Sequence, residues 1–311
     1  GLVFGCAPPV MTGRVIGVEG GVYTLMLEDG RRVEASLRGR LKQESRGDSK
    51  IVIGDCVKVE ETDGSATVQA RLPRQTTMVR RGVAGRSAKV LAANLDRVFV
   101  VMAIEPTPRT ELIDRFLVVA EANGIPPVIL LNKMDLPGAA DVALSLSSRY
   151  ESVGYVVLCV SAKADIGIDR LRALLCEGIS AFMGPSGAGK STLLNKVEPG
   201  FKLRTGELSR KSRSGRHTTV SSSLLSLSCG GVVADTPGFS DVGLWGMDPA
   251  DLDWCFPEMR GLRNRCHFRG CAHLMDPGCA VRQAAEEGHV APERYESYKV
   301  LRAEAVGERS R

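Results

Sequence analysis

Residues 184–191 read Gly-Pro-Ser-Gly-Ala-Gly-Lys-Ser and match the phosphate-loop pattern G-x-x-x-x-G-K-[ST] without a mismatch. The apolar run at 179–183 predicts a buried strand before the loop, and residues 192–195 predict the first turn of a helix after it. In that setting the glycines let backbone N–H groups face phosphate oxygens, Lys190 reaches the terminal phosphates, and Ser191 offers a hydroxyl to Mg²⁺. The alternative, a glycine turn beside a surface lysine, does not explain the full match in a strand–loop–helix context.

The chain around this loop alternates apolar strands with amphipathic helices. Strands are expected at 97–104, 128–131, 156–160 and 179–183, and helices at 110–122, 141–150 and 168–176. In the first helix, Leu112, Phe116 and Val119 share one face. This alternation is typical of βαβ units, so we expect a mostly parallel sheet in an α/β domain.

Two short motifs follow the ends of these strands and predict a guanine site. Asn132-Lys133-Met134-Asp135 comes directly after the strand at 128–131, and Ser161-Ala162-Lys163 follows the next one. The Asp135 carboxylate can accept N–H bonds from guanine N1 and the exocyclic amine, whereas adenine would leave it unpaired. The Ser-Ala-Lys backbone is expected to contact the guanine oxygen. Asn-Lys-x-Asp also occurs by chance, but its position at a strand end beside a phosphate loop favours guanine recognition.

A third motif, Asp235-Thr236-Pro237-Gly238, follows a predicted strand at 232–234. We expect Asp235 to hold Mg²⁺ through a water and the Gly238 amide to sense the terminal phosphate. Residues 215–219 form the expected switch loop, in which Thr219, rather than Thr218, is the candidate Mg²⁺ ligand.

The order of these motifs differs from that of Ras-like GTPases. In those enzymes the phosphate loop comes first and the Asn-Lys-x-Asp and Ser-Ala-Lys motifs come last, whereas here the last two precede it. The sequence therefore predicts a circularly permuted domain, which is tolerated because domain termini usually lie close together at the surface. The switch region now leads directly into the C-terminal part, so nucleotide state could reposition that part.

The position after Gly238 is Phe239, where Ras-like enzymes place a glutamine that orients the attacking water. A phenyl ring has no polar group, so slow hydrolysis by the free protein is expected. His217 is the candidate that positions water, because an imidazole can accept a proton near neutral pH. The alternative is a surface histidine that only contacts RNA. Lys190 and Thr219 complete the predicted catalytic set.

Residues 11–72 predict an all-β domain. Short strands are expected at 15–18, 22–27, 32–37, 51–53, 57–59 and 67–70, separated by glycine-containing turns. About five strands in about 60 residues suit a small OB-type barrel, a fold that often, but not always, binds nucleic acid. Arg38, Arg40 and Lys42 fall on one of its loops.

Positive charge is concentrated in two blocks, although the net charge is only +5. The block at 71–89 contains no acid and carries Arg71, Arg74, Arg80, Arg81, Arg86 and Lys89. The block at 200–217 carries Lys202, Arg204, Arg210, Lys211, Arg213 and Arg216 against Glu207 alone. Such blocks are typical of phosphate-binding surfaces, and a solvated basic face is the alternative for each.

Near the C-terminus, Cys266, Cys271, His273 and Cys279 are spaced C-x4-C-x-H-x5-C. Three thiolates and an imidazole suit tetrahedral structural Zn²⁺, with His267 as the alternative nitrogen ligand and free buried cysteines as the alternative reading. Four arginines, at 260, 263, 265 and 269, flank the cluster with positive charge. The remaining cysteines are expected to be unlinked core or surface residues in a reducing compartment: Cys6, Cys56, Cys159, Cys176, Cys229 and Cys255.

Composition restricts the class of protein. The 311 residues allow two or three domains, and 43% hydrophobic content indicates a globular chain. No apolar run approaches the roughly 20 residues of a membrane span, so no membrane partner is expected. Residues 1–9 lack the features of a secretory signal, which favours a cytoplasmic location, and the absence of an initial Met suggests a processed end.

The motif order and the zinc pattern together resemble the circularly permuted ribosome small-subunit-dependent GTPase A family over the full length of the chain. The resemblance implies a multidomain chain: an OB-type β-barrel RNA-binding domain at 1–72, a basic linker at 73–93, a permuted α/β P-loop GTPase domain at 94–245, and a small zinc-binding α domain with a closing helix at 281–305 within 246–311. It also favours His273 over His267 as the ligand and implies a catalytic role for His217.

The same resemblance implies a monomeric GTP hydrolase that binds the small ribosomal subunit and its rRNA and acts in late maturation, with one Zn²⁺ per chain and Mg²⁺ with GTP. Two rival hypotheses are a GTP-dependent RNA-binding switch with incidental hydrolysis and a GTPase acting on a protein or membrane partner. The predicted GTP/GDP site comprises Asn132, Lys133, Asp135, Ser161, Ala162, Lys163, Gly184, Pro185, Ser186, Gly187, Ala188, Gly189, Lys190, Ser191, Thr192, Asp235 and Gly238, with Mg²⁺ at Ser191, Thr219 and Asp235.

Overall fold

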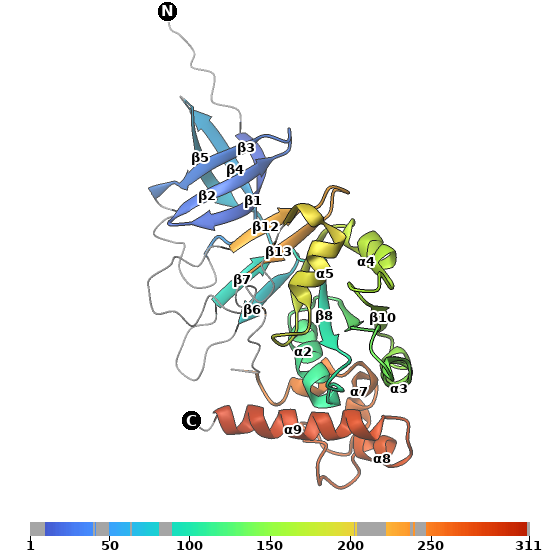
Figure 1. Cartoon of the computed structure of the whole chain (residues 1–311). Coiled ribbons are helices and arrows are strands. Elements are labelled where there is room, and N and C mark those ends of the chain that lie inside the picture. Colours follow the sequence, from blue (N-terminus) through green and yellow to red (C-terminus); the bar gives the residue numbers. More distant parts are fainter. Residues whose placement is uncertain are drawn as a thin grey trace, which may run out of the picture.

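The computed structural model describes residues 10–39, 41, 50–62, 64–80, 89–201, 203, 222–236, 239 and 247–309. Figure 1 shows a β-barrel in blue near the N-terminus, a central sheet flanked by helices, and a helical C-terminal part whose last helix, in red, crosses the opposite end of the molecule.

The barrel is formed by β1 (Val10–Glu19), β2 (Val22–Leu27), β3 (Arg32–Leu37), β4 (Cys56–Thr62) and β5 (Ser65–Arg71). Pairing of β1 with β4 closes the order β1-β2-β3-β5-β4, in which only the β3–β5 pair is parallel. Inward side chains such as Val15, Leu25 and Val59 are fully buried in its interior. The expected OB-type barrel is confirmed.

The strand expected at 51–53 is wrong, because these apolar residues form a buried turn instead. The turn is closed by Asp55, whose Oδ2 accepts a hydrogen bond from Val52 N at 2.9 Å. Asp55 in turn pairs with Arg74 at 2.8 Å, and only 8% of the Arg74 side chain is exposed. Arg74 is therefore a structural residue, and its assignment to a phosphate-binding block is wrong.

A two-stranded antiparallel sheet occupies the stretch expected to be a linker. It consists of β6 (Thr77–Arg80) and β7 (Lys89–Ala93). Neither strand was predicted, because short strands among basic residues carry little hydrophobic periodicity.

The central sheet has the order β10-β9-β8-β11-β13-β12. Its strands are β8 (Arg97–Ala103), β9 (Pro127–Asn132), β10 (Val156–Val160), β11 (Ile179–Met183), β12 (Ser222–Ser226) and β13 (Val232–Asp235). All neighbours are parallel except β12 and β13, so the expected mostly parallel sheet is confirmed. β12 was not predicted; it also pairs with β1 through Gly17 and Ser223, which joins the barrel and the central sheet into one continuous sheet.

Helices cover both faces of the central sheet. Side chains of α2 (Thr110–Ala122) and α3 (Ala139–Glu151) share one apolar cluster, and those of α4 (Ile168–Leu175) and α5 (Lys190–Val197) share the other. Alternate residues of β8 enter the two clusters, as the pleat of a strand requires. A strand buried on both faces explains the continuous apolar run in the sequence.

The C-terminal part packs on the α2 face of the sheet. It contains η3 (Leu252–Cys255), α7 (Pro257–Arg260), η4 (Arg263–Arg265), α8 (Ala280–Glu286) and α9 (Pro292–Arg309). The remaining short helix, η2 (Pro199–Phe201), lies outside this part and follows α5. Phe256, Tyr298 and Leu301 belong to the same buried cluster as α2. The single closing helix expected at 281–305 is wrong, because a turn with Gly288 at φ +77° separates α8 from α9.

One covalent link was not expected from the sequence. Cys176 and Cys229 form a disulfide, although they lie 53 residues apart in the chain. The expectation that both cysteines are unlinked is wrong, and no local pattern could have revealed a pairing that depends on how α4 meets the β12–β13 turn.

Candidate nucleotide site and metal centre

The predicted nucleotide motifs meet at one edge of the central sheet. In the parallel pairs, Ala181 of β11 lies opposite Ala234 of β13, and Val160 of β10 lies opposite Asn132 of β9. The carboxyl ends of these strands therefore coincide, as is usual for ligand sites of open α/β sheets. This arrangement places the phosphate loop beside Asp235 on one side and near the two guanine motifs on the other.

The phosphate loop requires glycine at two described positions for steric reasons. Gly184 has φ +140°, and a Cβ there would lie 2.2 Å from the Val101 carbonyl oxygen. Gly189 has φ +95°, and its Cβ would lie 2.3 Å from Asn132 Nδ2. The loop then enters α5 at Lys190, so the backbone N–H groups of the first turn face the loop.

Lys190 is folded into the loop that precedes it. Its Nζ donates to the carbonyl oxygens of Gly184 at 2.6 Å and Pro185 at 2.9 Å, and only 6% of the residue is exposed. Burial lowers the pKa of the Lys190 ammonium to about 8. The next residue, Ser191, is equally buried, whereas Thr192 and Ser186 are exposed.

Asn132 connects the first guanine motif to the phosphate loop. It is 4% exposed, and its Nδ2 donates to the Ala188 carbonyl oxygen at 2.9 Å. The amide therefore holds two segments that are distant in sequence in a fixed relationship.

The Asp135 carboxylate is oriented by the second guanine motif. Ser161 Oγ donates to Asp135 Oδ1 at 2.6 Å, and Ser161 Oγ itself accepts from Ala164 N at 3.1 Å. The hydrogen bond from Ser161 is the main reason that the pKa of the Asp135 carboxyl lies below its usual value. Lys163 Nζ lies 3.9 Å from Asp135 Oδ2 and adds positive charge at the rim, so the carboxylate is ionised.

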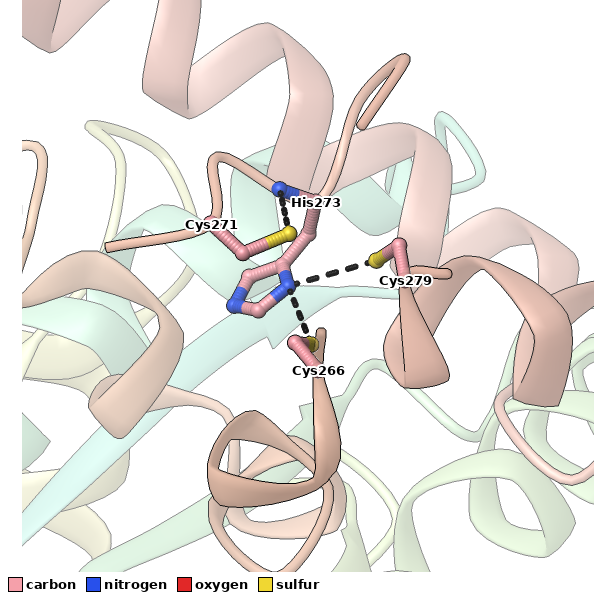
Figure 2. Close-up of side chains that lie close together, drawn as sticks. All are labelled: Cys266, Cys271, His273 and Cys279. Carbon is pink, nitrogen blue, oxygen red and sulfur yellow. Dashed lines mark hydrogen bonds between the residues drawn. The ribbon is translucent and has the colours of Figure 1, made fainter. Parts of the chain in front are cut away.

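A metal centre is formed by the predicted cysteine and histidine ligands. The ligand atoms of Cys266, Cys271, His273 and Cys279 all lie within 4.8 Å of one another. Figure 2 shows the His273 ring directed between the sulfur atoms, with Nδ1 3.5 Å from Cys266 Sγ and 3.4 Å from Cys279 Sγ. His267, the alternative nitrogen, lies outside this group and packs edge to face on Phe268.

Backbone N–H groups complement the sulfur atoms. His273 N donates to Cys271 Sγ at 3.4 Å, and Arg282 N donates to Cys279 Sγ at 3.3 Å. Hydrogen bonds of this kind favour the thiolate form that metal binding requires. The donor set and its spacing therefore fit a metal ion held by three thiolates and one imidazole.

Comparison with known proteins identifies the family. Residues 71–245 match the family model for the RsgA GTPase. The chain is 44% identical over 301 residues to the small ribosomal subunit biogenesis GTPase RsgA of Gemmatimonas aurantiaca, with 95% of this chain and 98% of the relative covered. The chain belongs to the RsgA GTPase family.

A second relative and two solved structures cover the chain equally well. The RsgA of Moorella thermoacetica is 40% identical, with 95% of this chain and 98% of the relative covered. The crystal structure of YjeQ from Thermotoga maritima matches with a TM-score of 0.81 at 33% identity and covers 96% of this chain and 99% of that one. YloQ, described as a circularly permuted GTPase, matches with a TM-score of 0.75 at 29% identity over 96% of each chain. The resemblance stated from the sequence is confirmed.

Several residues predicted for this RsgA-type site lie outside the described residues. They are His217, Thr219 and Gly238, together with the rest of 204–221. Phe239 is described: it is 3% exposed and belongs to the apolar cluster on the α2 face. Its ring is therefore part of the apolar core.

Two further residues contribute to these sites and were missed by sequence reasoning. Asp253 in η3 accepts from His273 Nε2 at 3.0 Å and also pairs with Arg263 at 3.2 Å. A carboxylate on the distal nitrogen fixes the ring and its tautomer, with Nδ1 left for the metal. Asp165, after the second guanine motif, pairs with Lys196 of α5 at 3.1 Å. The Asp253–His273 and Asp165–Lys196 contacts each join residues at least 20 positions apart, so no local pattern in the sequence indicates them.

Among the described residues, we found no helix with the length and apolar character needed to span a membrane.

Proposed function

We propose that this chain is a GTP hydrolase that acts on the small ribosomal subunit in its late maturation. The guanine preference rests on one observation, the ionised Asp135 carboxylate, which Ser161 holds by a 2.6 Å hydrogen bond at the edge of the sheet. Oδ1 is anchored by Ser161, and a carboxylate oxygen retains further lone pairs, so the group can accept two N–H bonds from a guanine. An adenine has no matching pair of N–H donors, so the carboxylate would lose water on binding without gaining a partner, which costs affinity.

The roles of the phosphate-side residues follow from their positions. Lys190 would exchange its two carbonyl partners for phosphate oxygens, and the N–H groups that begin α5 would face the same oxygens. Ser191, Asp235 and Thr219 would hold Mg²⁺, which supplies charge neutralisation at the β- and γ-phosphates. His217 would orient the attacking water, because the residue at the position of the Ras-like glutamine, Phe239, is buried in an apolar cluster.

We also propose that the metal centre holds one Zn²⁺ with a structural role. Three thiolates and one imidazole complete a tetrahedron, so no coordination position is left for a substrate. The centre anchors the segment between η4 and α8. Helix α9 supports the same segment, because Tyr295 Oη donates a hydrogen bond to the His273 carbonyl oxygen at 2.6 Å. The metal would therefore hold the C-terminal part on the central sheet.

Several observations support the small ribosomal subunit as the partner. The similar proteins are named small ribosomal subunit biogenesis GTPases, and an OB-type barrel suits RNA. Next to the metal centre, Arg265 and Arg269 are exposed. We propose that the protein acts as a monomer in the cytoplasm, where it contacts rRNA phosphates through these arginines and through the barrel.

The test combines nucleotide turnover with subunit binding. GTP hydrolysis by the full chain should be slow alone and rise when purified small subunits are added. Tight RNA binding without stimulation would favour an RNA-binding switch instead. The affinity for small subunits should fall steeply as the salt concentration rises. The double variant Arg265→Gln/Arg269→Gln should lower the slope of the logarithm of the binding constant against the logarithm of the salt concentration by roughly 1 to 2. Arg172→Gln is the matched control, because Arg172 lies on α4, outside the barrel, and is paired with Asp169. A salt-independent affinity would indicate a protein partner.

A further inference from the structure

The Cys176–Cys229 disulfide lies outside the nucleotide loops and the metal centre. Cys176 ends α4, and Cys229 lies in the turn between β12 and β13, with the two Cα atoms 5.4 Å apart. Cys229 is exposed and Cys176 is half-buried, so an external thiol can reach the bond. Neither sulfur is used by the proposed hydrolysis.

The turn that carries Cys229 is held against the ends of two helices. Ser228 donates from both N and Oγ to Glu198 Oε2, at 2.9 and 2.8 Å, and Glu198 ends α5. Gly231 lies so close to α4 that a Cβ there would be 1.8 Å from the Leu175 carbonyl oxygen. The disulfide makes this contact covalent.

The β12–β13 hairpin links several parts of the proposed machinery. β12 pairs with β1 of the barrel at Ser223, and it follows directly after the stretch that contains His217 and Thr219. β13 ends at Asp235, which lies opposite Ser223 in the hairpin. α4 and α5 follow the second guanine motif and the phosphate loop, respectively. A covalent bond between this turn and α4 therefore restrains how the barrel and Asp235 move relative to the nucleotide loops.

We propose that Cys176–Cys229 is a reversible thiol–disulfide exchange site whose oxidised form fixes the β12–β13 hairpin, and that a protein dithiol is its reductant. A reductant thiolate attacks the exposed Cys229 Sγ, the Cys176–Cys229 bond breaks, and Cys176 leaves as a thiolate that takes up a proton. The second reductant thiolate attacks the mixed disulfide and releases Cys229, which is also protonated. The chain gains two electrons and two protons, and the reductant becomes a disulfide.

The consequence for turnover rests on the proposed function. When the subunit binds to the barrel, it displaces β12, which is paired with β1 of the barrel. The hairpin then transmits this displacement to Asp235. A hairpin that is tied to α4 at its far turn transmits less displacement, so the oxidised protein is expected to respond less to the subunit. The guanine motifs and the phosphate loop lie outside the hairpin, so GDP affinity is expected to be the same in both forms.

The experiment uses the full-length, metal-loaded protein in oxidised form and after treatment with a dithiol reductant. Mass mapping should find the 176–229 cross-link only before treatment. Backbone amides of β12 and β13 should exchange hydrogen about tenfold more slowly in the oxidised form. Stimulated GTP turnover should rise about threefold on reduction. Cys229→Ser should behave like the reduced protein with or without reductant, whereas Cys56→Ser in the barrel should keep the response.

Each readout decides a separate claim. Absence of the cross-link without reductant would overturn the proposal, as would equal hydrogen exchange of the hairpin in the two forms. If Cys229→Ser still responded to reductant, the metal thiolates would be the site of action and this disulfide would be excluded. If the exchange difference were present but no form hydrolysed GTP with subunits, the proposed function would fail and the exchange site would stand.

Discussion

Arg294 of α9 and Asp114 of α2 form an ion pair with Nη1 and Oδ1 2.5 Å apart, and only 1% and 0% of the two side chains are exposed. Arg294 also pairs with Glu258 at 2.7 Å, and its guanidinium lies 4.7 Å from the centre of the Phe256 ring. The pair joins the C-terminal part to a helix that directly covers the central sheet. The C-terminal part and the α2 face of the sheet therefore share one core.

Arg294→Met should destabilise the protein by about 3 to 5 kcal/mol, because it leaves the buried Asp114 carboxylate without its cation. Burial raises the pKa of Asp114, and Arg294 opposes that effect, so the variant should retain a proton on Asp114. Urea unfolding measures the loss. The control is Arg115→Met, which breaks the less buried pair with Glu304 and should cost about 1 kcal/mol. A similar loss of unfolding free energy in both variants would show that the buried pair of Arg294 and Asp114 does not stabilise the protein more than the less buried pair does.

Asp135→Asn should weaken GTP and GDP about 100-fold, because the two N–H bonds from guanine to an ionised carboxylate are lost. Xanthosine nucleotides should bind better to the variant, since their ring edge offers an acceptor in place of a donor. Equilibrium binding of guanosine, xanthosine and adenosine nucleotides measures the change in affinity. Equal binding of ATP and GTP by the unaltered protein would show that Asp135 does not read the base.

Binding of a nucleotide should consume protons near pH 8. The pKa of Lys190 is about 8 in the free protein, and phosphate oxygens would raise it toward or above its usual value. Between these two values the bound state holds more protons than the free state, so affinity falls as pH rises above 8. Calorimetry in buffers of different ionisation enthalpy should detect uptake of about half a proton at pH 8. Lys190→Arg stays protonated throughout, so the same uptake in that variant would exclude Lys190 as its source.

The sequence was sufficient wherever function depends on contiguous motifs. The phosphate loop, the two guanine motifs and the cysteine pattern each lie within fourteen consecutive residues, and the alternation of apolar strands with helices predicted β9, β10 and β11. It was insufficient where partners are distant along the chain: Asp253 with His273, Arg74 with Asp55, and Cys176 with Cys229. The turn at 51–53 shows a different limit, since apolar residues can be buried in a turn and mimic a strand.

Asp253→Asn should lower metal affinity by about 10- to 100-fold, because the carboxylate fixes the tautomer of His273 and raises its basicity. Competition with a chromophoric chelator measures the affinity, and metal analysis of fresh protein should find one zinc per chain. Asp251→Asn, in an exposed position two residues earlier, is the matched control. An unchanged affinity in Asp253→Asn would show that packing by Tyr295 and Tyr298 suffices to orient the ring.

His217→Ala should bind GTP and small subunits normally and lose subunit-stimulated turnover, because the imidazole is the proposed group that orients water. Phe239 cannot take that role: it is 3% exposed in the core on the α2 face. Restoring the Ras-like residue with Phe239→Gln should therefore leave basal turnover low, and it should destabilise the protein by about 3 kcal/mol, since an amide replaces a ring in an apolar cluster. Single-turnover hydrolysis with and without subunits, together with unfolding of both variants, measures these effects. Full stimulated turnover in His217→Ala would leave the water to be positioned by the ribosome, and faster basal turnover in Phe239→Gln would show that position 239 can reach the terminal phosphate.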